Sequence, residues 1–261
     1  MQIKEIDYTK LERCGKGYEG RVFKYGNDAI KIFRSKIFES SWKFESKINK
    51  LEYLNYYKPN NICYPKYFVS NKHHIIGYGM DLIPTKENLE SLENIFKDKS
   101  TTFENKISLA IEAYDIVLNS NYYGFFIIDS NFRNFLYNEK SKNLTAIDSD
   151  SIATPFHKCE FPPIFFHNYY KDKFNNSING DYTRYVIALQ ILSNLFNTTI
   201  DRDNLILYDK TDDYLEEVIE KLNFSKEIIE ELQLFFQDNK SSIDFKDILL
   251  NIKKEKVLTK K

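Results

Sequence analysis

Glycine, proline, cysteine and a surplus of either charge are all scarce in this sequence. Its 261 residues include 8 Gly, 6 Pro and 3 Cys, and 37 Lys and Arg face 38 Asp and Glu, for a net charge of -1. Without a charge surplus, neither nucleic acid nor an anionic membrane is an expected partner. With 42% apolar and 16% aromatic residues and so few chain breakers, the sequence predicts a folded globular protein and excludes a disordered one.

The three cysteines, Cys14, Cys63 and Cys159, are odd in number, far apart and without a CxxC pair. They indicate neither a disulfide framework nor a zinc ribbon, and they fit a reducing compartment. The N-terminus has scattered charges and no apolar signal-peptide core, and no run of about 18 apolar residues occurs. We therefore expect a cytoplasmic protein with no membrane partner.

Two regions of different character follow one another along the chain. Residues 8–33 alternate short apolar runs with glycines, which is typical of antiparallel strands joined by tight turns. Apolar spacing then predicts a helix at 36–54 and strands at 67–70 and 73–82. Beyond Pro84, the pattern predicts helices at 103–118, 182–196 and 214–236, and two β-like runs, 125–128 and 144–147, each followed by an aspartate. This order predicts an α+β protein whose second part is mainly helical.

The first motif that could carry chemistry is GKGYEGRVFKYGNDAIKIF, residues 15–33. Its glycines, Gly15, Gly17 and Gly20, lie between strands and not before a helix. This setting disfavours a dinucleotide-binding fold and favours a hairpin that covers a nucleotide. Glycines let the backbone approach phosphate closely, and Lys31 on the next strand can neutralise phosphate oxygens.

A lysine in a phosphate site needs an acidic residue to fix it, and the helix predicted at 36–54 offers one. Glu45 shares one helix face with Ile48 and Leu51, so we expect Glu45 to orient Lys31. Glu39 and Glu52 compete for this role, and a solvated helix charge is the alternative interpretation of Glu45.

The second motif is GFFIIDSNFRNFLYN, in which Asp129 and Asn134 are five residues apart, and Asp148 follows fourteen residues later. Two carboxylates and an amide so placed can hold magnesium against phosphate oxygens and orient an attacking hydroxyl. When such a pattern occurs alone, a turn or a cap explains it. The two motifs in this order are more specific than either one.

With both motifs present, the chain resembles the protein-kinase-like superfamily over residues 11–196. GKGYEGRV is similar to the glycine-rich loop, AIK to the strand with the ATP-binding lysine, and IIDSNFRN to the catalytic loop. MDLIP resembles the hinge, AIDSDS takes the place of DFG, and GDYTRYVIALQIL resembles the buried helix beyond the activation segment. The resemblance implies a two-lobed protein-kinase-like fold: an N-lobe of antiparallel β-sheet and one helix at 1–83, and a mainly α-helical C-lobe at 84–261.

The resemblance also implies the role of each residue. Asp129 would be the catalytic base, Lys31 the phosphate-binding lysine, and Asn134 and Asp148 the magnesium ligands, while Asp181 would brace the catalytic loop. The implied cofactors are ATP and Mg²⁺, and the implied partners are the nucleotide and a hydroxyl acceptor on a protein or a small molecule. The implied nucleotide-binding residues are Gly15, Gly17, Tyr18, Gly20, Val22, Ala29, Lys31, Glu45, Met80, Asp81 and Ile83.

The sequence departs from the family pattern in ways that bear on function. Ile127 and Ile128 replace His-Arg before the catalytic aspartate, and Asn131 stands where Ser/Thr kinases have lysine, which leaves Arg133 to contact the transferred phosphate. No APE triplet is present, and DSD replaces DFG. We expect a divergent Ser/Thr protein kinase. A small-molecule kinase of the aminoglycoside-phosphotransferase type and a pseudokinase scaffold are the alternatives.

Overall fold

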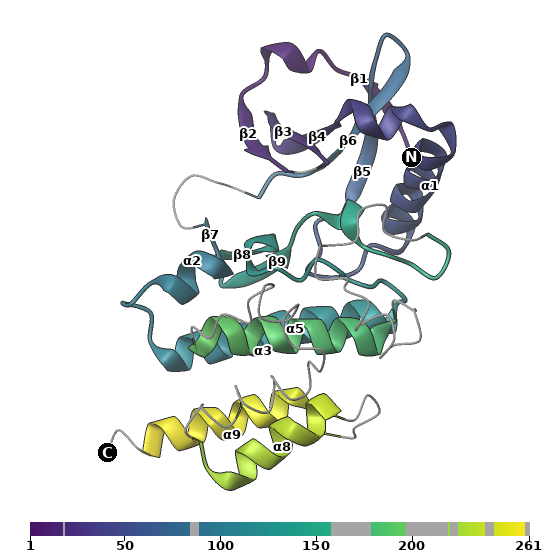
Figure 1. Ribbon diagram of the computed structural model, residues 1–261. Coiled ribbons are helices and arrows are strands. Elements are labelled where there is room, and N and C mark those ends of the chain that lie inside the picture. The colour runs from purple at the N-terminus through teal and green to yellow at the C-terminus, as the bar shows by residue number, and fades with distance from the viewer. Residues whose placement is uncertain are drawn as a thin grey trace.

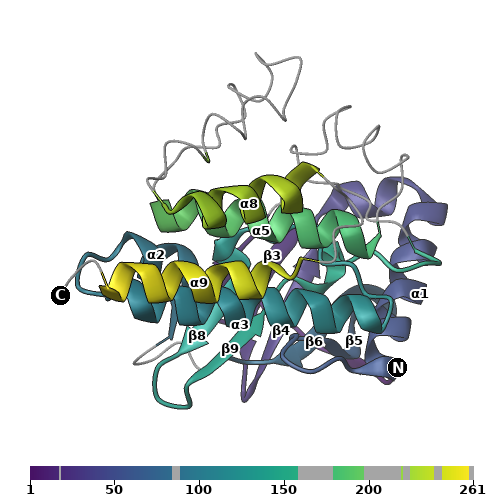
Figure 2. The ribbon, with the colours of Figure 1, turned by 90° about the horizontal axis from the view of Figure 1, so that it is seen from below.

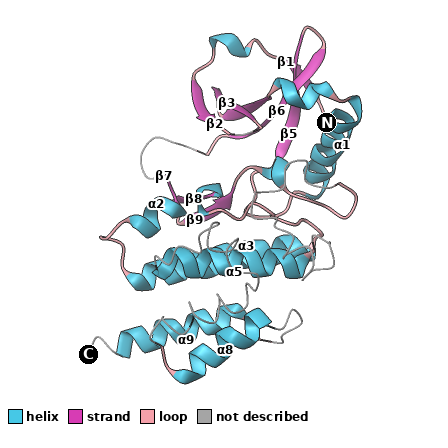
Figure 3. Ribbon diagram, viewed as in Figure 1, coloured by secondary structure: helices cyan, strands magenta, loops and turns pink. Residues whose placement is uncertain are grey.

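The protein has an α+β architecture in which a six-stranded sheet precedes a mainly helical part (Figures 1 and 3). This arrangement confirms the α+β class expected from the sequence. The computed structural model describes residues 1–17, 19–83, 89–157, 179–196, 219, 224–237 and 243–258. None of the helices within these ranges is long and apolar enough to cross a membrane.

The six-stranded sheet is formed by the first 81 residues in the order β1-β5-β6-β4-β3-β2. All its neighbouring strands are antiparallel except β1 and β5, which pair in parallel, so the expectation of a wholly antiparallel sheet is wrong at this edge. A three-residue strand is too short to produce an alternating pattern, which is why β1 was not predicted. The strands are β1 (Ile3–Glu5), β2 (Arg13–Lys16), β3 (Gly20–Tyr25), β4 (Asp28–Phe33), β5 (Pro65–Asn71) and β6 (His74–Asp81).

Strand β4 is buried on both faces, and its alternation decides where Lys31 points. Ile30 and Ile32 belong to a small apolar cluster on one face of the sheet. Because successive side chains of a strand alternate, Ala29 and Lys31 share the opposite face, together with Phe33, which joins the main core. The strand pattern therefore places a lysine among buried residues.

Helix α1 (Ser41–Tyr57) lies beside the sheet (Figure 1). It begins later than the predicted 36–54, because residues 35–39 form a short 3₁₀ turn and the Ser40 hydroxyl accepts a hydrogen bond from the Lys43 N–H. Such an N-cap satisfies one of the free N–H groups of the first helical turn. The helix turns Lys47, Lys50, Leu51 and Leu54 inward.

The second part begins with a small antiparallel sheet, β7-β8-β9, and continues into stacked helices. Helices α3 and α5 lie side by side, and α8 and α9 form a further layer against them (Figures 1 and 2). Their bounds are β7 (Leu89–Ser91), α2 (Leu92–Lys97), α3 (Phe103–Tyr122), β8 (Phe135–Asn138), β9 (Asn143–Ala146), α5 (Gly180–Phe196), α8 (Lys226–Gln237) and α9 (Phe245–Leu258).

The β-like runs predicted in this part have different outcomes. Strand β9 corresponds to the run at 144–147, but the run at 125–128 forms only an isolated bridge between Phe126 and Ala153. That run is buried without a neighbouring strand to extend the ladder. Of the helix predicted at 214–236, the C-terminal half is α8, and most of its N-terminal half lies outside the described residues.

One hydrophobic cluster runs through both parts of the protein. It joins Phe33 and Leu54 of the first part to Ile107, Tyr114 and Ile187 of the helices. Backbone hydrogen bonds tie the two parts together directly, because Ala146 accepts from the Cys63 N–H and donates to Asn61, both at 2.8 Å. These contacts fix the sheet over the loops that follow α3 and β9.

Candidate active site

A cavity of about 500 Å³ lies between the six-stranded sheet and the small sheet. Its walls come from β2, β4 and β6 on one side and from the loops after α3 and β9 on the other. It gathers most of the residues that the sequence assigned to nucleotide binding or catalysis. Those in its lining are Gly15, Gly17, Val22, Ala29, Lys31, Met80, Asp81, Ile83, Asp129, Asn134 and Asp148.

Of the assigned residues that the structure describes, Gly20 and Glu45 are not among those that line the cavity. Tyr18 lies outside the described residues. Gly20 is buried at the start of β3, where a Cβ would lie 2.6 Å from the carbonyl oxygen of Ile32. The packing of two adjacent strands is therefore what requires glycine at position 20. Glu45 is exposed on α1.

Apolar side chains form the part of the cavity nearest β6. Val22, Ala29 and Met80 come from the large sheet, and Leu136 and Ile147 come from the other side. Ala29 pairs with Met80 across β4 and β6, so these walls continue the sheet register directly. A flat apolar ring fits between such walls, and the backbone at 81–83 supplies hydrogen-bonding groups at their edge.

A polar cluster fixes the strand ends at this edge. The Lys66 ammonium donates to Asp28 Oδ1 and Asp81 Oδ1, both at 2.9 Å, and the Tyr67 hydroxyl donates to Asp28 Oδ2 at 2.9 Å. Partial burial by itself would raise the pKa of Asp28, but the hydrogen bonds from Lys66 and Tyr67 lower it below its ordinary value. The hydrogen bonds to Asp28 and Asp81 stabilise the charged form of Lys66, so they raise the pKa of its ammonium. The cluster clamps the end of β6 to the starts of β4 and β5.

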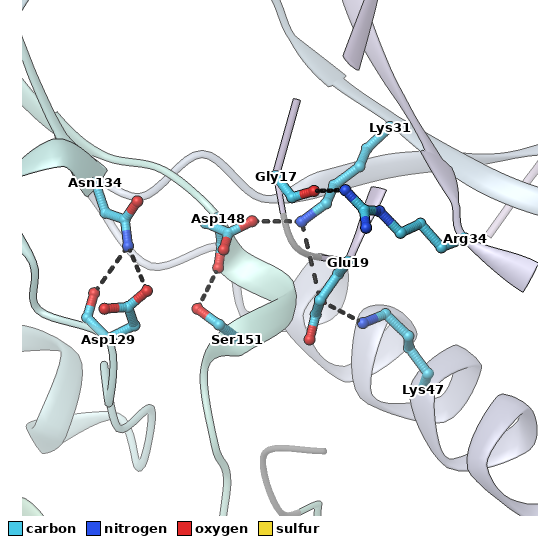
Figure 4. Close-up of polar contacts among 9 residues, drawn as sticks. All are labelled: Gly17, Glu19, Lys31, Arg34, Lys47, Asp129, Asn134, Asp148 and Ser151. Carbon is cyan, nitrogen blue, oxygen red and sulfur yellow. Dashed lines mark hydrogen bonds and ion pairs between the residues drawn. The ribbon is translucent and has the colours of Figure 1, made fainter. Parts of the chain in front are cut away.

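Lys31 is 3% exposed, and its ammonium donates a hydrogen bond to the carboxylate of Asp148. A second carboxylate oxygen, Oε2 of Glu19, lies 3.9 Å from the same nitrogen (Figure 4). Burial of an ammonium is costly unless it is paired and hydrogen-bonded, and these two acids supply that pairing.

Glu19 is a site residue that the sequence analysis missed. It lies in the glycine-rich loop, is 6% exposed, and accepts a hydrogen bond from the buried Lys47 of α1 at 2.7 Å (Figure 4). Two signals could have indicated it. Glu19 is the acidic residue within GKGYEG, and Lys47 and Lys50 occupy inward positions of the same helical pattern as Leu51 and Leu54.

The expectation that Glu45 orients Lys31 is not met by this structure. Two residues along a helix turn about 200° around its axis, so Glu45 faces away from the side that carries Lys47. The competing acids are exposed as well: Glu39 lies in the 3₁₀ turn, and Glu52 accepts a hydrogen bond from the Met1 amino group. Helix α1 thus presents a lysine where the resemblance implied a glutamate.

Asp129 is held by hydrogen bonds from a residue of its own segment. The side-chain amide of Asn134 donates to Asp129 Oδ2 at 2.9 Å and to its carbonyl oxygen at 3.1 Å (Figure 4). Ile127 and Ile128, which replace the family's His-Arg, are buried in the core. Because the Asn134 amide nitrogen serves Asp129, its oxygen is the atom that can ligate a metal.

Asp148 has left-handed backbone angles, φ 67° and ψ 43°, which are uncommon for any residue but glycine. Ser151 stabilises this turn, since its N–H and its hydroxyl donate to the Asp148 carbonyl at 3.0 and 2.8 Å. The turn directs the carboxylate into the cavity toward Lys31.

Two further expectations concern Arg133 and Asp181. Arg133 lines the cavity, and its Nε lies 3.2 Å from Glu93 Oε2, so the guanidinium is tethered at the rim. Asp181 is exposed at the start of α5 and is not seen to brace the catalytic loop. The end of α3 is joined to α5 by Asn121, which donates to Gly180 O at 3.1 Å and accepts from the Thr183 hydroxyl at 2.8 Å.

The donor set suits magnesium better than a transition metal. Asp148 and Asn134 offer hard oxygen ligands on one cavity wall. Within the described ranges, no group of three or more His, Cys, Asp and Glu could hold a metal ion by itself. Mg²⁺ commonly takes one or two protein oxygens and completes its shell with water and substrate phosphates, so this pair fits it.

Comparison with known proteins adds no family to this description. No protein-family model matches the sequence, and a search of the curated proteins gives no match.

Proposed function

We propose that this protein is an ATP-dependent phosphotransferase with a two-lobed protein-kinase-like fold, an N-lobe at 1–83 and a C-lobe at 84–261. The proposed reaction is that of a divergent Ser/Thr protein kinase. One observation carries the proposal: Lys31, Asp129, Asn134 and Asp148, from three segments of the chain, line one cavity beside a glycine-rich loop, and Lys31 contacts Asp148. A lysine, a base and two oxygen ligands in one cleft are the parts that phosphoryl transfer requires.

In this proposal the cavity binds the nucleotide along its whole length. The adenine ring packs between Val22, Ala29 and Met80, while the backbone at 81–83 pairs with its edge. The backbone of Gly15 and Gly17 approaches the phosphates, and Lys31 neutralises their oxygens. Magnesium, held by Asn134 and Asp148, supplies further neutralisation of phosphate charge.

Asp129 acts on the acceptor. Its carboxylate accepts the hydrogen bond of the acceptor hydroxyl and orients it toward the γ-phosphorus. As the hydroxyl oxygen bonds to that phosphorus, the bond to the β–γ bridging oxygen breaks, ADP leaves with the electron pair, and the hydroxyl proton passes to Asp129. The Asn134 hydrogen bond at 2.9 Å keeps the carboxylate in this orientation.

A nucleotide-binding pseudokinase is the second candidate, and one observation favours it. Helix α1 brings Lys47 to the site in place of the glutamate that the resemblance implied. A chain that binds Mg-ATP without transferring phosphate would use the same cavity as a ligand-controlled scaffold.

Two measurements separate these proposals. Thermal unfolding with and without millimolar Mg-ATP reports binding, because a ligand of the native state raises its apparent stability. Incubation with γ-labelled ATP then reports transfer to casein, to the protein itself, or to a panel of aminoglycosides and choline-like alcohols. We expect a thermal shift and label on protein Ser or Thr. A shift without transfer supports the nucleotide-binding pseudokinase, and label on a small alcohol alone supports the small-molecule kinase. The absence of any shift contradicts both kinases and favours a scaffold that binds no nucleotide.

A further inference from the structure

Four charged side chains meet at the inner end of the cavity: Glu19, Lys31, Lys47 and Asp148 (Figure 4). Glu19 occupies the centre, since its Oε2 lies 2.7 Å from the Lys47 nitrogen and 3.9 Å from the Lys31 nitrogen. The side chains of Glu19, Lys31 and Lys47 are only 6%, 4% and 1% exposed. Asp148, at 32%, is the member that borders the open cavity.

Charges this deeply buried depend on one another. Removing one partner of a buried pair leaves the other uncompensated, which costs far more than an exposed pair is worth. The carboxylate of Glu19 therefore compensates Lys47 directly and lies close enough to act on Lys31. Its geometry makes it the link between a helix lysine and a strand lysine.

Glu19 also belongs to the loop that borders the phosphate end of the cavity. The loop is closed by a hydrogen bond from the Gly17 N–H to Gly20 O at 2.9 Å. Arg34 holds the loop from the sheet side. Its guanidinium donates a hydrogen bond to Gly17 O at 2.9 Å, and its backbone N–H donates one to Glu19 O at 3.0 Å. The Glu19 side chain adds the connection to α1, so the loop is anchored to both the sheet and the helix.

We infer that Glu19, held in place by Lys47, is the positioning residue of Lys31. This inference rests on the proposed function. There the Asp148 carboxylate is required as a magnesium ligand, and Glu19 then provides the counter-charge that keeps the Lys31 ammonium directed into the cavity. The task that the resemblance gave to a helix glutamate is performed by a loop glutamate, and the helix contributes the lysine that fixes it.

This arrangement has a consequence that a helix glutamate would not have. Because Glu19 is part of the glycine-rich loop, the position of Lys31 and the position of the loop depend on the same interaction. A displacement of the loop from α1 removes the carboxylate from Lys31 at the same moment.

The kinetic test uses Glu19→Gln, Lys47→Met and their combination, with the exposed Glu12→Gln and Lys43→Met as matched controls. We expect Glu19→Gln to lower both the unfolding midpoint and kcat, the latter about 10²-fold, because it removes the carboxylate that Lys47 and Lys31 both face. In the double variant both buried charges are neutral, so stability recovers while kcat stays about 10²-fold low. Lys47→Met retains the carboxylate but removes the group that fixes it, so we expect a smaller loss of kcat, about tenfold. A double variant with wild-type kcat would mean that Glu19 serves stability alone, and would overturn the inference.

A second test does not depend on catalysis. Acetic anhydride acetylates lysine amines, and peptide mass spectrometry gives the rate at Lys31 in the nucleotide-free protein. A lysine held by carboxylates reacts more slowly, so this rate reports the pairing of Lys31. The comparison is between Asp148→Asn, in which Lys31 lacks the Asp148 carboxylate, and Asp148→Asn/Glu19→Gln, in which it lacks both carboxylates. The buried Lys50 is the internal control for unfolding. Lys31 should react about tenfold faster in the double variant than in Asp148→Asn, with Lys50 unchanged. Equal Lys31 rates overturn the role of Glu19, whereas a wild-type protein that transfers no phosphate overturns only the proposed function.

Discussion

The Lys31 ammonium donates a hydrogen bond to the carboxylate of Asp148, a residue 117 positions further along the chain. The contact crosses the cavity from the large sheet to the turn after β9, so it depends on how the two parts of the protein pack together. Both side chains line the space in which the proposed nucleotide would lie. A nucleotide bound there would meet this ion pair directly.

Asp129→Asn tests the proposed base. The substitution keeps the shape of the side chain, and the Asn134 contact at 2.9 Å can be retained by the amide oxygen. We expect kcat to fall by about 10² to 10⁴, because the new amide cannot accept the hydroxyl proton. Affinity for Mg-ATP, measured by calorimetry, should stay near that of the wild type. A variant that retains most of its transfer rate would remove Asp129 from the mechanism, and Glu139→Gln in the exposed β8–β9 turn is the control.

Replacing Gly20 by alanine should lower the stability of the fold, whereas replacing Gly17 by alanine should lower the affinity for Mg-ATP. At Gly20 the new Cβ would lie 2.6 Å from Ile32 O, so we expect Gly20→Ala to destabilise the fold by about 1 to 3 kcal/mol. At Gly17 the nearest atom would be 4.0 Å away, and we expect its unfolding free energy to change by less than about 0.5 kcal/mol. Gly17→Ala should instead weaken Mg-ATP binding, because Gly17 lines the cavity. Urea unfolding and calorimetry on both variants check this, and a reversed pattern would contradict it.

Cys14 offers a probe of nucleotide binding that needs no activity. The residue lies exposed at the cavity wall, and desolvation of its thiol by the surrounding atoms raises the pKa above the ordinary value. Alkylation by iodoacetamide should therefore be slow at pH 7, accelerate as the pH rises to 9 and beyond, and be suppressed by millimolar Mg-ATP. Cys63 also lines the cavity, but burial raises its pKa to about 12, so it should react far more slowly. Equal Cys14 labelling with and without Mg-ATP, measured by peptide mass spectrometry, would argue against a nucleotide in this cavity.

Asp28→Asn should lower the free energy of unfolding at neutral pH. The difference in unfolding free energy between the wild type and the variant should become smaller in acid. Because the pKa of folded Asp28 is lowered, its carboxylate stabilises the fold above its unfolded pKa, about 3.9, and this contribution disappears as the pH falls through the folded value. With Lys66 37% exposed, solvent screens the pair, so we expect a loss of about 1 kcal/mol at pH 7. Urea unfolding of both proteins between pH 7 and pH 3.5 checks the trend. A difference that grows toward low pH would contradict the assignment.

The sequence predicted most of the elements that face the cavity, because their signals are local. Alternation in DAIKIF places Ala29 and Lys31 on one face of β4, and the apolar spacing over 36–54 predicts most of α1. It did not predict β1, whose partner β5 lies some 65 residues away in the chain. It also assigned a β-like run to 125–128, where an apolar run lacks a strand to pair with beyond the bridge at Phe126.

The pattern of residues by itself determined which chemical groups are available: the three glycines of GKGYEG ahead of Lys31, Asp129 and Asp148 at the ends of apolar runs, and Asn134 five residues after Asp129. Only the tertiary structure decided which acid serves Lys31. The rotation of α1 follows from its cap at Ser40 and from the burial of Leu51 and Leu54, and it turns Glu45 to solvent. Glu19 reaches the site because a loop, a strand and a helix converge, and helical periodicity carries no information about such a meeting. The partners of buried charges depend on long-range packing, because a buried charge is stable only beside an opposite charge that the fold places next to it.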